Sequence, residues 1–320
     1  MKYLIVFFFY CSHLGSCQVT TLNAEKKANS IRYDSLTNYL ADKPHGYIGQ
    51  ELYVLPKNKS VQEKGYQGFI LDPNIKYSNG KMEKSNIYKC CQAVENSIYE
   101  ELSEKYFKVL DVVKGNPDLS YHGYFLKLKS KSSGDIVYYR YFPQDTRPSG
   151  YPFLVRGYFE KQKKLLVGKS FITRKRKWDY AQGEPLLDIV TGKEVEFVPG
   201  KVWTCIDYMV DPNWGQPALI LKSLAGEKIA LLDDHKNNET YVFSPARAEA
   251  IKKQFGETKW KSFLENKIEL GMSKEELQLS VGKPDQVILT TQGTPEKEYW
   301  EYGTKMLTIQ EGKVTNIRDL

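Results

Sequence analysis

The sequence predicts an α+β protein rich in β-strands, with two small antiparallel β-barrel-like repeats followed by a two-helix, three-strand unit. Tyrosine and phenylalanine are abundant, with 23 and 14 residues in a chain of 320, and aromatic side chains favour strands. Short alternating segments occur twice in the same order, which indicates repetition. Near the C-terminus, helix-capping residues precede further strand segments. The length predicts two or three domains.

The N-terminus has the pattern of an export signal. Lys2 precedes a short apolar run from Tyr3 to Tyr10, and Leu14-Gly15-Ser16-Cys17 follows. The run is too short for a helix that spans a membrane. The last four residues resemble the bacterial lipobox, which implies a signal peptide over 1–16 and a lipid anchor on Cys17; the alternative is ordinary cleavage without lipid. Residues 17–45 are polar and predict a tether.

Two segments of the chain, 46–143 and 165–243, carry matching landmarks in the same order. Each has a glycine before a strand, an aromatic residue and an aspartate in a second strand, and a glycine in a hairpin turn: Gly49 and Gly168, Phe107 and Trp203, Asp111 and Asp207, Gly134 and Gly226. The match predicts an internal duplication, although unrelated hairpins also share such features. Each unit loosely resembles the SH3-like barrels of bacterial envelope proteins. A connector rich in Pro and Gly over 144–164 separates them.

The first repeat contains an insertion, roughly 57–105, in which the sequence predicts a helix over 85–106. Ser85 could cap this helix. Apolar side chains recur at spacings of three and four, namely Ile87, Cys91, Val94, Ile98 and Leu102. This stripe would bury Cys91 in the core and leave Cys90 outside it.

Three cysteines remain after the predicted lipidation, and an odd number argues against a disulfide framework. Cys205 lies in an alternating strand on the same face as Trp203, which predicts a buried, small apolar side chain. A bond from Cys205 to Cys90 or Cys91 stays open, and a bond between two adjacent cysteines is rare.

Residues 244–320 predict a helical linker and a compact C-terminal domain. Ser244 and Pro245 start a helix that Gly256 ends, and a second helical segment covers 258–267. A short third helix has signals at both ends. These signals are a capping box of Ser273 and Glu276, a hydrophobic staple of Met272 and Leu277, and stop residues Gly282 and Pro284. A helix of about two turns cannot stand alone in water, so it must pack on the strands that follow.

The strand segments of this domain cover 285–291, 297–303 and 305–317. The last of them turns at Glu311-Gly312, which pairs Ile309 with Val314. Trp300 and Tyr302 alternate on one face of the middle strand.

The C-terminal segment resembles a known family, the SmpA/OmlA (BamE-like) outer-membrane lipoproteins. The resemblance covers about 256–320, and its matching points are Gly271-Met272-Ser273, Gly282-Lys283-Pro284 and Trp300-x-Tyr302. It implies the two-helix, three-strand fold and a role in binding proteins or anionic lipid without catalysis. The matching residues make the fold and are not ligand contacts, so the resemblance carries fold further than function.

No pattern in the chain predicts catalysis, a metal site or a cofactor. The polar stretch 231–240 gathers Asp233, Asp234 and His235 but lacks the spacing of a calcium loop. Cysteine catalysis needs a thiol near a basic histidine, whereas Cys90 and Cys91 fall inside the predicted helix. Phosphate-binding glycine loops and nucleophile-elbow motifs are also missing.

A basic stretch over 156–178 is the candidate site for an anionic ligand. It interleaves aromatic side chains with Lys163, Lys164, Arg174, Lys175, Arg176 and Lys177, among others. In an exported protein the ligand would be a lipid head group, lipopolysaccharide or an acidic glycan, and no nucleic acid partner is expected. The alternative is the solvated face of a hairpin.

The sequence therefore predicts an exported cell-envelope lipoprotein, at the outer membrane and facing the periplasm or the cell surface. It would act as a non-catalytic protein-binding or assembly module whose partner contacts lie around Met272, Trp300 and Tyr302. Two alternatives remain: a binder of anionic ligands through 156–178 and a divergent cell-wall hydrolase. The identity of a small-molecule ligand stays open.

Overall fold

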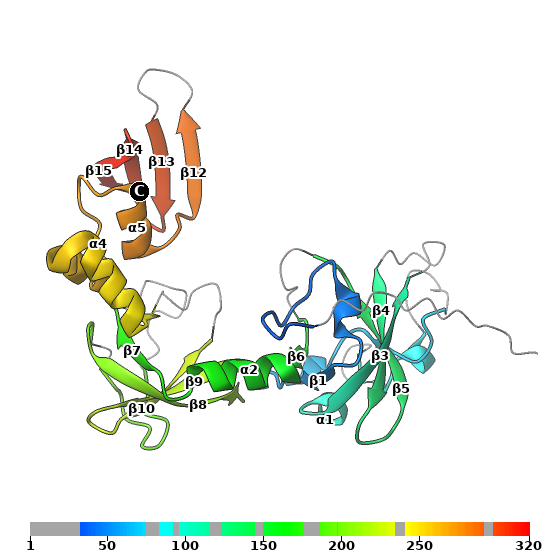
Figure 1. Cartoon of the computed structure of the whole chain (residues 1–320). Coiled ribbons are helices and arrows are strands. Elements are labelled where there is room, and N and C mark those ends of the chain that lie inside the picture. Colours follow the sequence, from blue (N-terminus) through cyan, green and yellow to red (C-terminus); the bar gives the residue numbers. More distant parts are fainter. Residues whose placement is uncertain are drawn as a thin grey trace, which may run out of the picture.

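The computed structural model describes residues 33–74, 83–91, 96–115, 123–144, 150–175, 186–196, 198–233, 241–290 and 297–320. These residues form three antiparallel sheets that follow one another along the chain (Figure 1). The prediction of a β-rich protein with antiparallel sheets is confirmed. None of the sheets closes into a barrel within the described residues, so the prediction of barrel-like repeats was wrong.

The first sheet has six strands in the order β2-β5-β4-β3-β1-β6. Its strands are β1 (Glu51–Val54), β2 (Phe69–Ile70), β3 (Tyr106–Lys114), β4 (Tyr124–Ser130), β5 (Ile136–Tyr141) and β6 (Phe153–Val155). Alternation along β3, β4 and β5 places one set of side chains in the core and the other set outside, as the period of two requires.

The second sheet has five strands in the order β10-β9-β8-β7-β11. Its strands are β7 (Ser170–Thr173), β8 (Val202–Asp211), β9 (Gln216–Ser223), β10 (Lys228–Leu232) and β11 (Val242–Phe243). Replacing β1, β3, β4, β5 and β6 by β7, β8, β9, β10 and β11 reproduces the order of the first sheet. Among the described strands, β2, which the insertion supplies, is the one without a counterpart in the second sheet.

The landmark pairs of the two repeats occupy equivalent positions. Each first glycine has a positive φ, 83° at Gly49 and 82° at Gly168. Their N–H groups donate to the carbonyls of Val109 and Cys205, over 2.9 and 2.8 Å. Phe107 pairs with Leu52, and Trp203 pairs with Phe171, which puts both aromatic residues at the same step of the ladder.

The two aspartates mark the same β-bulge. The register of β3 on β4 shifts between Val109 and Asp111, and that of β8 on β9 shifts between Cys205 and Asp207. In each case the aspartate Oδ1 accepts the N–H of the next residue, over 2.8 and 2.7 Å. Because a bulge leaves ladder groups unpaired, a carboxylate at this position satisfies one of them. The sequence match therefore follows a shared backbone geometry.

The predicted helix over 85–106 was wrong. The segment holds a short 3₁₀ turn η3 (Lys84–Asn86) and one helical turn α1 (Tyr99–Leu102), and β3 already begins at Tyr106. Ile87 bridges Ile70 of β2 instead of continuing a helix. Cys91 is exposed, opposite to the prediction, and the third position of the stripe, Val94, lies outside the described residues. Pairing with β2 decides this segment more strongly than its helical spacing does.

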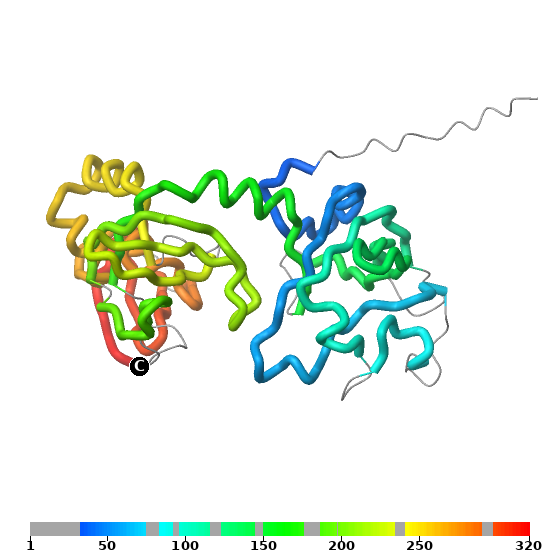
Figure 2. The backbone as a smooth tube through the Cα atoms, turned by 90° about the horizontal axis from the view of Figure 1, so that it is seen from below, coloured from blue at the N-terminus to red at the C-terminus, as the bar shows by residue number. Residues whose placement is uncertain are grey.

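The predicted tether and connector also carry structure. Within 33–45, Tyr39 is buried and donates its hydroxyl to the carbonyl of Phe142 over 2.7 Å. The nearby turn η1 (Pro44–Tyr47) places Tyr47 in the core. The connector contains β6, which pairs with β1, and helix α2 (Arg156–Leu166). Figure 2 shows α2 running between two lobes, of which the first holds the first sheet and the second holds the second sheet and the C-terminal domain.

The lobes also meet at one tight point. A Cβ at Gly215, in the turn between β8 and β9, would lie 1.8 Å from the carbonyl oxygen of Pro56. Gly215 has a φ of 60°, a region that glycine enters without a steric penalty. Only glycine therefore fits between the second sheet and the insertion of the first.

Helix α4 (Pro245–Leu264) leads to the C-terminal domain. Ser244 caps it by accepting the N–H of Arg247, over 3.2 Å, and Gly256 interrupts it with a φ of 82°. The predicted cap and stop are confirmed as a cap and a kink. After α5 (Lys274–Val281) come β12 (Gln286–Thr290), β13 (Lys297–Tyr302), β14 (Lys305–Gln310) and β15 (Lys313–Asp319), in that spatial order. The sheet has four strands and not three, because the last predicted segment is itself a hairpin that pairs Ile309 with Val314 as expected.

Candidate interaction edge of the C-terminal sheet

Helix α5 has the capping box that the sequence predicts. Ser273 Oγ accepts the N–H of Glu276 over 3.1 Å, and Glu276 Oε2 accepts the N–H of Ser273 over 2.7 Å. Met272 and Leu277, the predicted staple pair, are both fully buried in one cluster. Gly282 ends the helix with a φ of 82°. The local signals therefore fix where this short helix begins and ends.

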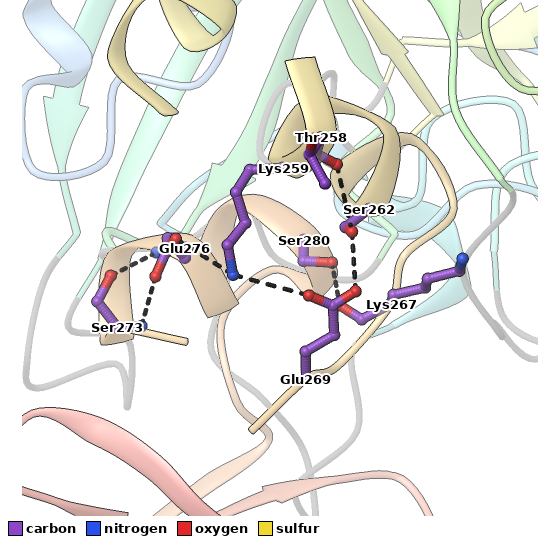
Figure 3. Close-up of polar contacts among 8 residues, drawn as sticks. All are labelled: Thr258, Lys259, Ser262, Lys267, Glu269, Ser273, Glu276 and Ser280. Atoms are coloured by element: carbon purple, nitrogen blue, oxygen red, sulfur yellow. Dashed lines mark hydrogen bonds and ion pairs between the residues drawn. The ribbon is translucent and has the colours of Figure 1, made fainter. Parts of the chain in front are cut away.

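A polar network joins this helix start to α4 (Figure 3). Lys259 Nζ lies 3.7 Å from Glu269 and 3.5 Å from Glu276. Ser262 donates to Glu269 Oε1 over 2.9 Å, and Ser280 donates to the carbonyl of Lys267 over 2.5 Å. Every member holds two segments of the chain together. The network therefore ties α4 to the segment before α5 and to α5 itself.

The inner face of the C-terminal sheet packs against the helices. Met272, Trp300 and Tyr302 are 0, 4 and 8% exposed. Tyr302 donates its hydroxyl to the carbonyl of Gly282 over 3.0 Å, and burial raises its pKa well above the ordinary value. Trp300 Nε1 donates to Glu298 over 2.9 Å. The three side chains predicted to touch a partner therefore hold the helix on the sheet, and none offers a surface in this conformation.

Strand β12 forms an edge of this sheet that the helices leave open. Val287, Ile288 and Leu289 are 45, 37 and 68% exposed. Val287 lies opposite Trp300 and Leu289 opposite Glu298, so both point toward the inner face, beyond the cover of α5. Within the described residues, β13 is the only strand that pairs with β12. Every second backbone N–H and C=O of an edge strand faces away from its neighbour and stays available.

The opposite edge of the same sheet is protected. The segment before α5 lies along β15: Gly271 donates to the carbonyl of Val314 over 2.8 Å, and Val314 donates to Met272 over 2.8 Å. A register shift between Thr308 and Ile309 bends this side. Strand β15 also carries charged side chains, Lys313, Arg318 and Asp319. Natural sheets use bulges, charges and covering segments to block edge pairing, and β12 has no charged residue or proline.

Sequence reasoning missed this edge although part of its signal is local. The segment Gln-Val-Ile-Leu-Thr, residues 286–290, is a short β-branched run free of charge. Its place at the end of the sheet depends on which strands pair, and the alternation of Trp300 and Tyr302 drew attention to the face that α5 covers.

The basic stretch does not form one surface. Lys163 pairs with Asp207 over 2.7 Å, while Lys164 is exposed within α2 and Lys175 is exposed after β7. Arg176 and Lys177 lie outside the described residues. The stretch folds as helix α2 followed by β7, and not as a hairpin.

Arg174, predicted as an anion-binding side chain, is buried and structural. It is 4% exposed. Its guanidinium donates to Asn266 Oδ1 over 3.0 and 2.7 Å and to the carbonyls of Leu279, over 3.0 Å, and Ser280. It also lies 4.8 Å from the ring centroid of Phe243. Because the buried guanidinium already donates to these acceptors, the prediction that Arg174 binds an anionic ligand was wrong.

The cysteines behave differently from one another. Cys205 is free and fully buried on the same face as Trp203, as predicted, and burial raises its thiol pKa to about 11. The sulfurs of Cys90 and Cys91 are bonded to each other. Among the residues with described positions, no group of three His, Cys, Asp or Glu side chains could hold a metal.

The structure does not describe the predicted N-terminal anchor. Cys17 and the signal segment 1–16 lie outside the described residues. Within the ranges given above, no helix is long and apolar enough to cross a membrane. Comparisons with protein-family models, curated proteins and solved structures find no match.

Proposed function

We propose that this chain is an exported cell-envelope lipoprotein that acts as a non-catalytic binding or assembly module. Its C-terminal domain would take up an extended segment of an envelope protein along β12. The open, apolar edge of the C-terminal sheet is the observation that carries this proposal. The lipobox-like segment at Cys17 and the resemblance to SmpA/OmlA lipoproteins support the location in the envelope.

Addition of a strand suits the chemistry of this edge. The backbone groups of β12 would supply hydrogen bonds, and alternate side chains would supply specificity, as in other complexes formed by β-augmentation. Val287 and Leu289 lie on one face and are two residues apart. A partner segment with apolar residues at alternate positions would cover them and extend the inner face that Trp300 and Tyr302 begin.

The contribution of Trp300 to binding becomes indirect in this proposal. Its ring is buried, so Trp300→Ala would first loosen α5 on the sheet and only then affect an interface. Binding measurements on that variant therefore cannot separate folding from recognition, and substitutions on the exposed β12 can.

The test is site-specific photo-crosslinking in the native cell envelope with the full chain. A photoreactive residue at position 289 should capture one defined protein through an extended segment, whereas the same residue at position 316 of β15 should not. Val287→Lys should abolish capture at 289, because a charge on an edge strand blocks pairing. The matched control is Thr315→Lys on the protected edge. Equal capture at both positions, or capture that survives Val287→Lys, would contradict the proposal.

The hydrolase alternative has a separate test. The full chain and its Cys90→Ser/Cys91→Ser variant are compared for release of fragments from purified peptidoglycan. We expect no release by either protein. Hydrolysis by the full chain that the double variant loses would assign catalysis to this cysteine pair and overturn the non-catalytic proposal.

A further inference from the structure

The outer face of the first sheet gathers three lysines. Lys108 of β3 lies directly opposite Lys129 of β4, and Lys127 lies one step further along the same face. None of these three lysines makes an ion pair among the described residues. Like charges placed directly opposite each other on a sheet destabilise it, so this arrangement lowers the stability of the sheet.

The carboxylates beside these lysines are already engaged. Glu51 lies opposite Lys108 on its other side, but it binds Lys131 over 2.5 Å and Arg156 over 2.9 Å, and hydrogen bonds from these groups lower its pKa. Asp111 lies opposite Lys127 and accepts the N–H of the bulge. Asp111 keeps its negative charge when it accepts this N–H, but three lysines against this one carboxylate leave the face with a net positive charge.

Exposed apolar side chains accompany the lysines. Leu110 and Val113 on β3 and Ile136 on β5 are 39, 37 and 40% exposed. Ile136 lies directly opposite Lys129. Aliphatic side chains beside lysines on a flat face suit the boundary of a bilayer, where apolar groups enter the interface and ammonium groups meet anionic head groups. A soluble polyanion would need the lysines but not the aliphatic groups.

The second sheet keeps the exposed apolar positions of this face and one of its three lysine positions. Ile206 and Met209 occupy the positions of Leu110 and Val113 and are 40 and 44% exposed. Thr204 and Ile220 stand where the first sheet has Lys108 and Lys127, whereas Lys222 keeps the position of Lys129 and lies opposite Lys228. The exposed apolar positions are common to both repeats, and the first repeat alone has a lysine at all three of these positions.

We infer that the outer face of the first sheet, built from Lys108, Lys127, Lys129, Leu110, Val113 and Ile136, binds the surface of an anionic membrane. The site lies in a different domain from the proposed protein-binding edge and does not depend on it. An attached lipid at Cys17 would hold the chain near a bilayer, and this face would orient the first lobe on it.

The test measures vesicle binding by sedimentation, using the full chain with Cys17→Ser so that no lipid is attached there. Binding to phosphatidylcholine vesicles is compared with and without phosphatidylglycerol. The variant Lys108→Gln/Lys127→Gln/Lys129→Gln should bind the anionic vesicles about a hundredfold more weakly, since each lysine near such a surface contributes about fivefold. Its thermal unfolding midpoint should stay equal or rise, because repulsion is relieved.

The matched control removes the same charge from the basic stretch as Lys164→Gln/Lys169→Gln/Lys175→Gln, and should retain most of the binding. A second variant, Leu110→Gln/Ile136→Gln, should weaken vesicle binding and leave binding to heparin unchanged. Failure of the full chain to prefer anionic vesicles would overturn the inference. Equal losses of vesicle binding in the two lysine variants would also overturn it. A third contrary result would be normal vesicle binding by Leu110→Gln/Ile136→Gln together with heparin binding that needs the three lysines, since the site would then serve a soluble polyanion.

Discussion

Replacement of Arg174 should show whether the second sheet and the C-terminal domain are held together by one buried cation. The guanidinium leaves β7 and reaches Asn266, after α4, and the last carbonyls of α5 at Leu279 and Ser280. Orphan carbonyls at a helix end require a partner, and a positive charge there is favourable. Arg174→Ala removes all of these interactions at once and leaves the acceptors buried.

The expected loss is about 3–5 kcal/mol in the free energy of unfolding. A hydrogen bond from a charged group contributes roughly 1.5–3 kcal/mol, and each buried acceptor left unpaired costs about 1–3 kcal/mol. The stacking on Phe243 adds up to about 2 kcal/mol in a desolvated site, and partial rearrangement offsets part of the sum. Arg174→Lys should recover less than half, because a single ammonium cannot span Asn266 and both carbonyls.

The assay is urea unfolding followed by the fluorescence of the five tryptophans, of which Trp260 and Trp300 lie in the C-terminal core and Trp203 in that of the second sheet. Lys175→Ala, at the exposed neighbouring position, is the control and should change stability by less than about 0.5 kcal/mol. If Arg174→Ala lowers stability no more than this control does, the contacts of the Arg174 guanidinium are not what holds the second sheet and the C-terminal domain together. If it instead folds normally and loses affinity for anionic ligands, the original prediction from sequence regains its place.

Three further predictions concern a contact, a cap and a pH dependence. Gly215→Ala should separate the two lobes and raise the radius of gyration in small-angle scattering. Gly134 also has a positive φ, 80°, but open space around its Cβ, so the control Gly134→Ala should leave the radius unchanged. Equal radii of gyration for the two variants would refute the tight contact. Ser273→Ala should cost about 1 kcal/mol of stability through the lost cap, and no loss in chemical denaturation would show that the cap is dispensable. Backbone N–H bonds, first that of Lys228, lower the pKa of Asp188 from 3.8 to about 2. Its carboxylate therefore stabilises the fold above pH 3.8, and this contribution is lost as the pH falls toward 2; Asp188→Asn should remove that part of the acid dependence, and an unchanged acid profile would contradict it.

The sequence by itself determined the features that depend on neighbouring residues. Ser273 and Glu276 cap a helix because the hydroxyl, the carboxylate and the orphan N–H groups all lie within one turn. Gly49 and Gly168 matched across the repeats because a positive φ near 80° strongly favours glycine. Strand positions were also legible where alternation is strict, as at Trp203 and Cys205, since a period of two places both on one face.

Only the tertiary structure decided which surfaces are free. Arg174 belongs to a basic stretch in sequence, yet three acceptors from distant segments bury it. The spacing that predicted a helix around Ile87 was overruled by pairing with β2, since a pairing partner far away in sequence can satisfy the same backbone groups. Trp300 is buried and Leu289 is exposed, although both lie on the inner face of the sheet, because α5 covers only part of that face. The extent of sheet that α5 covers depends on packing between elements, and no local pattern records it.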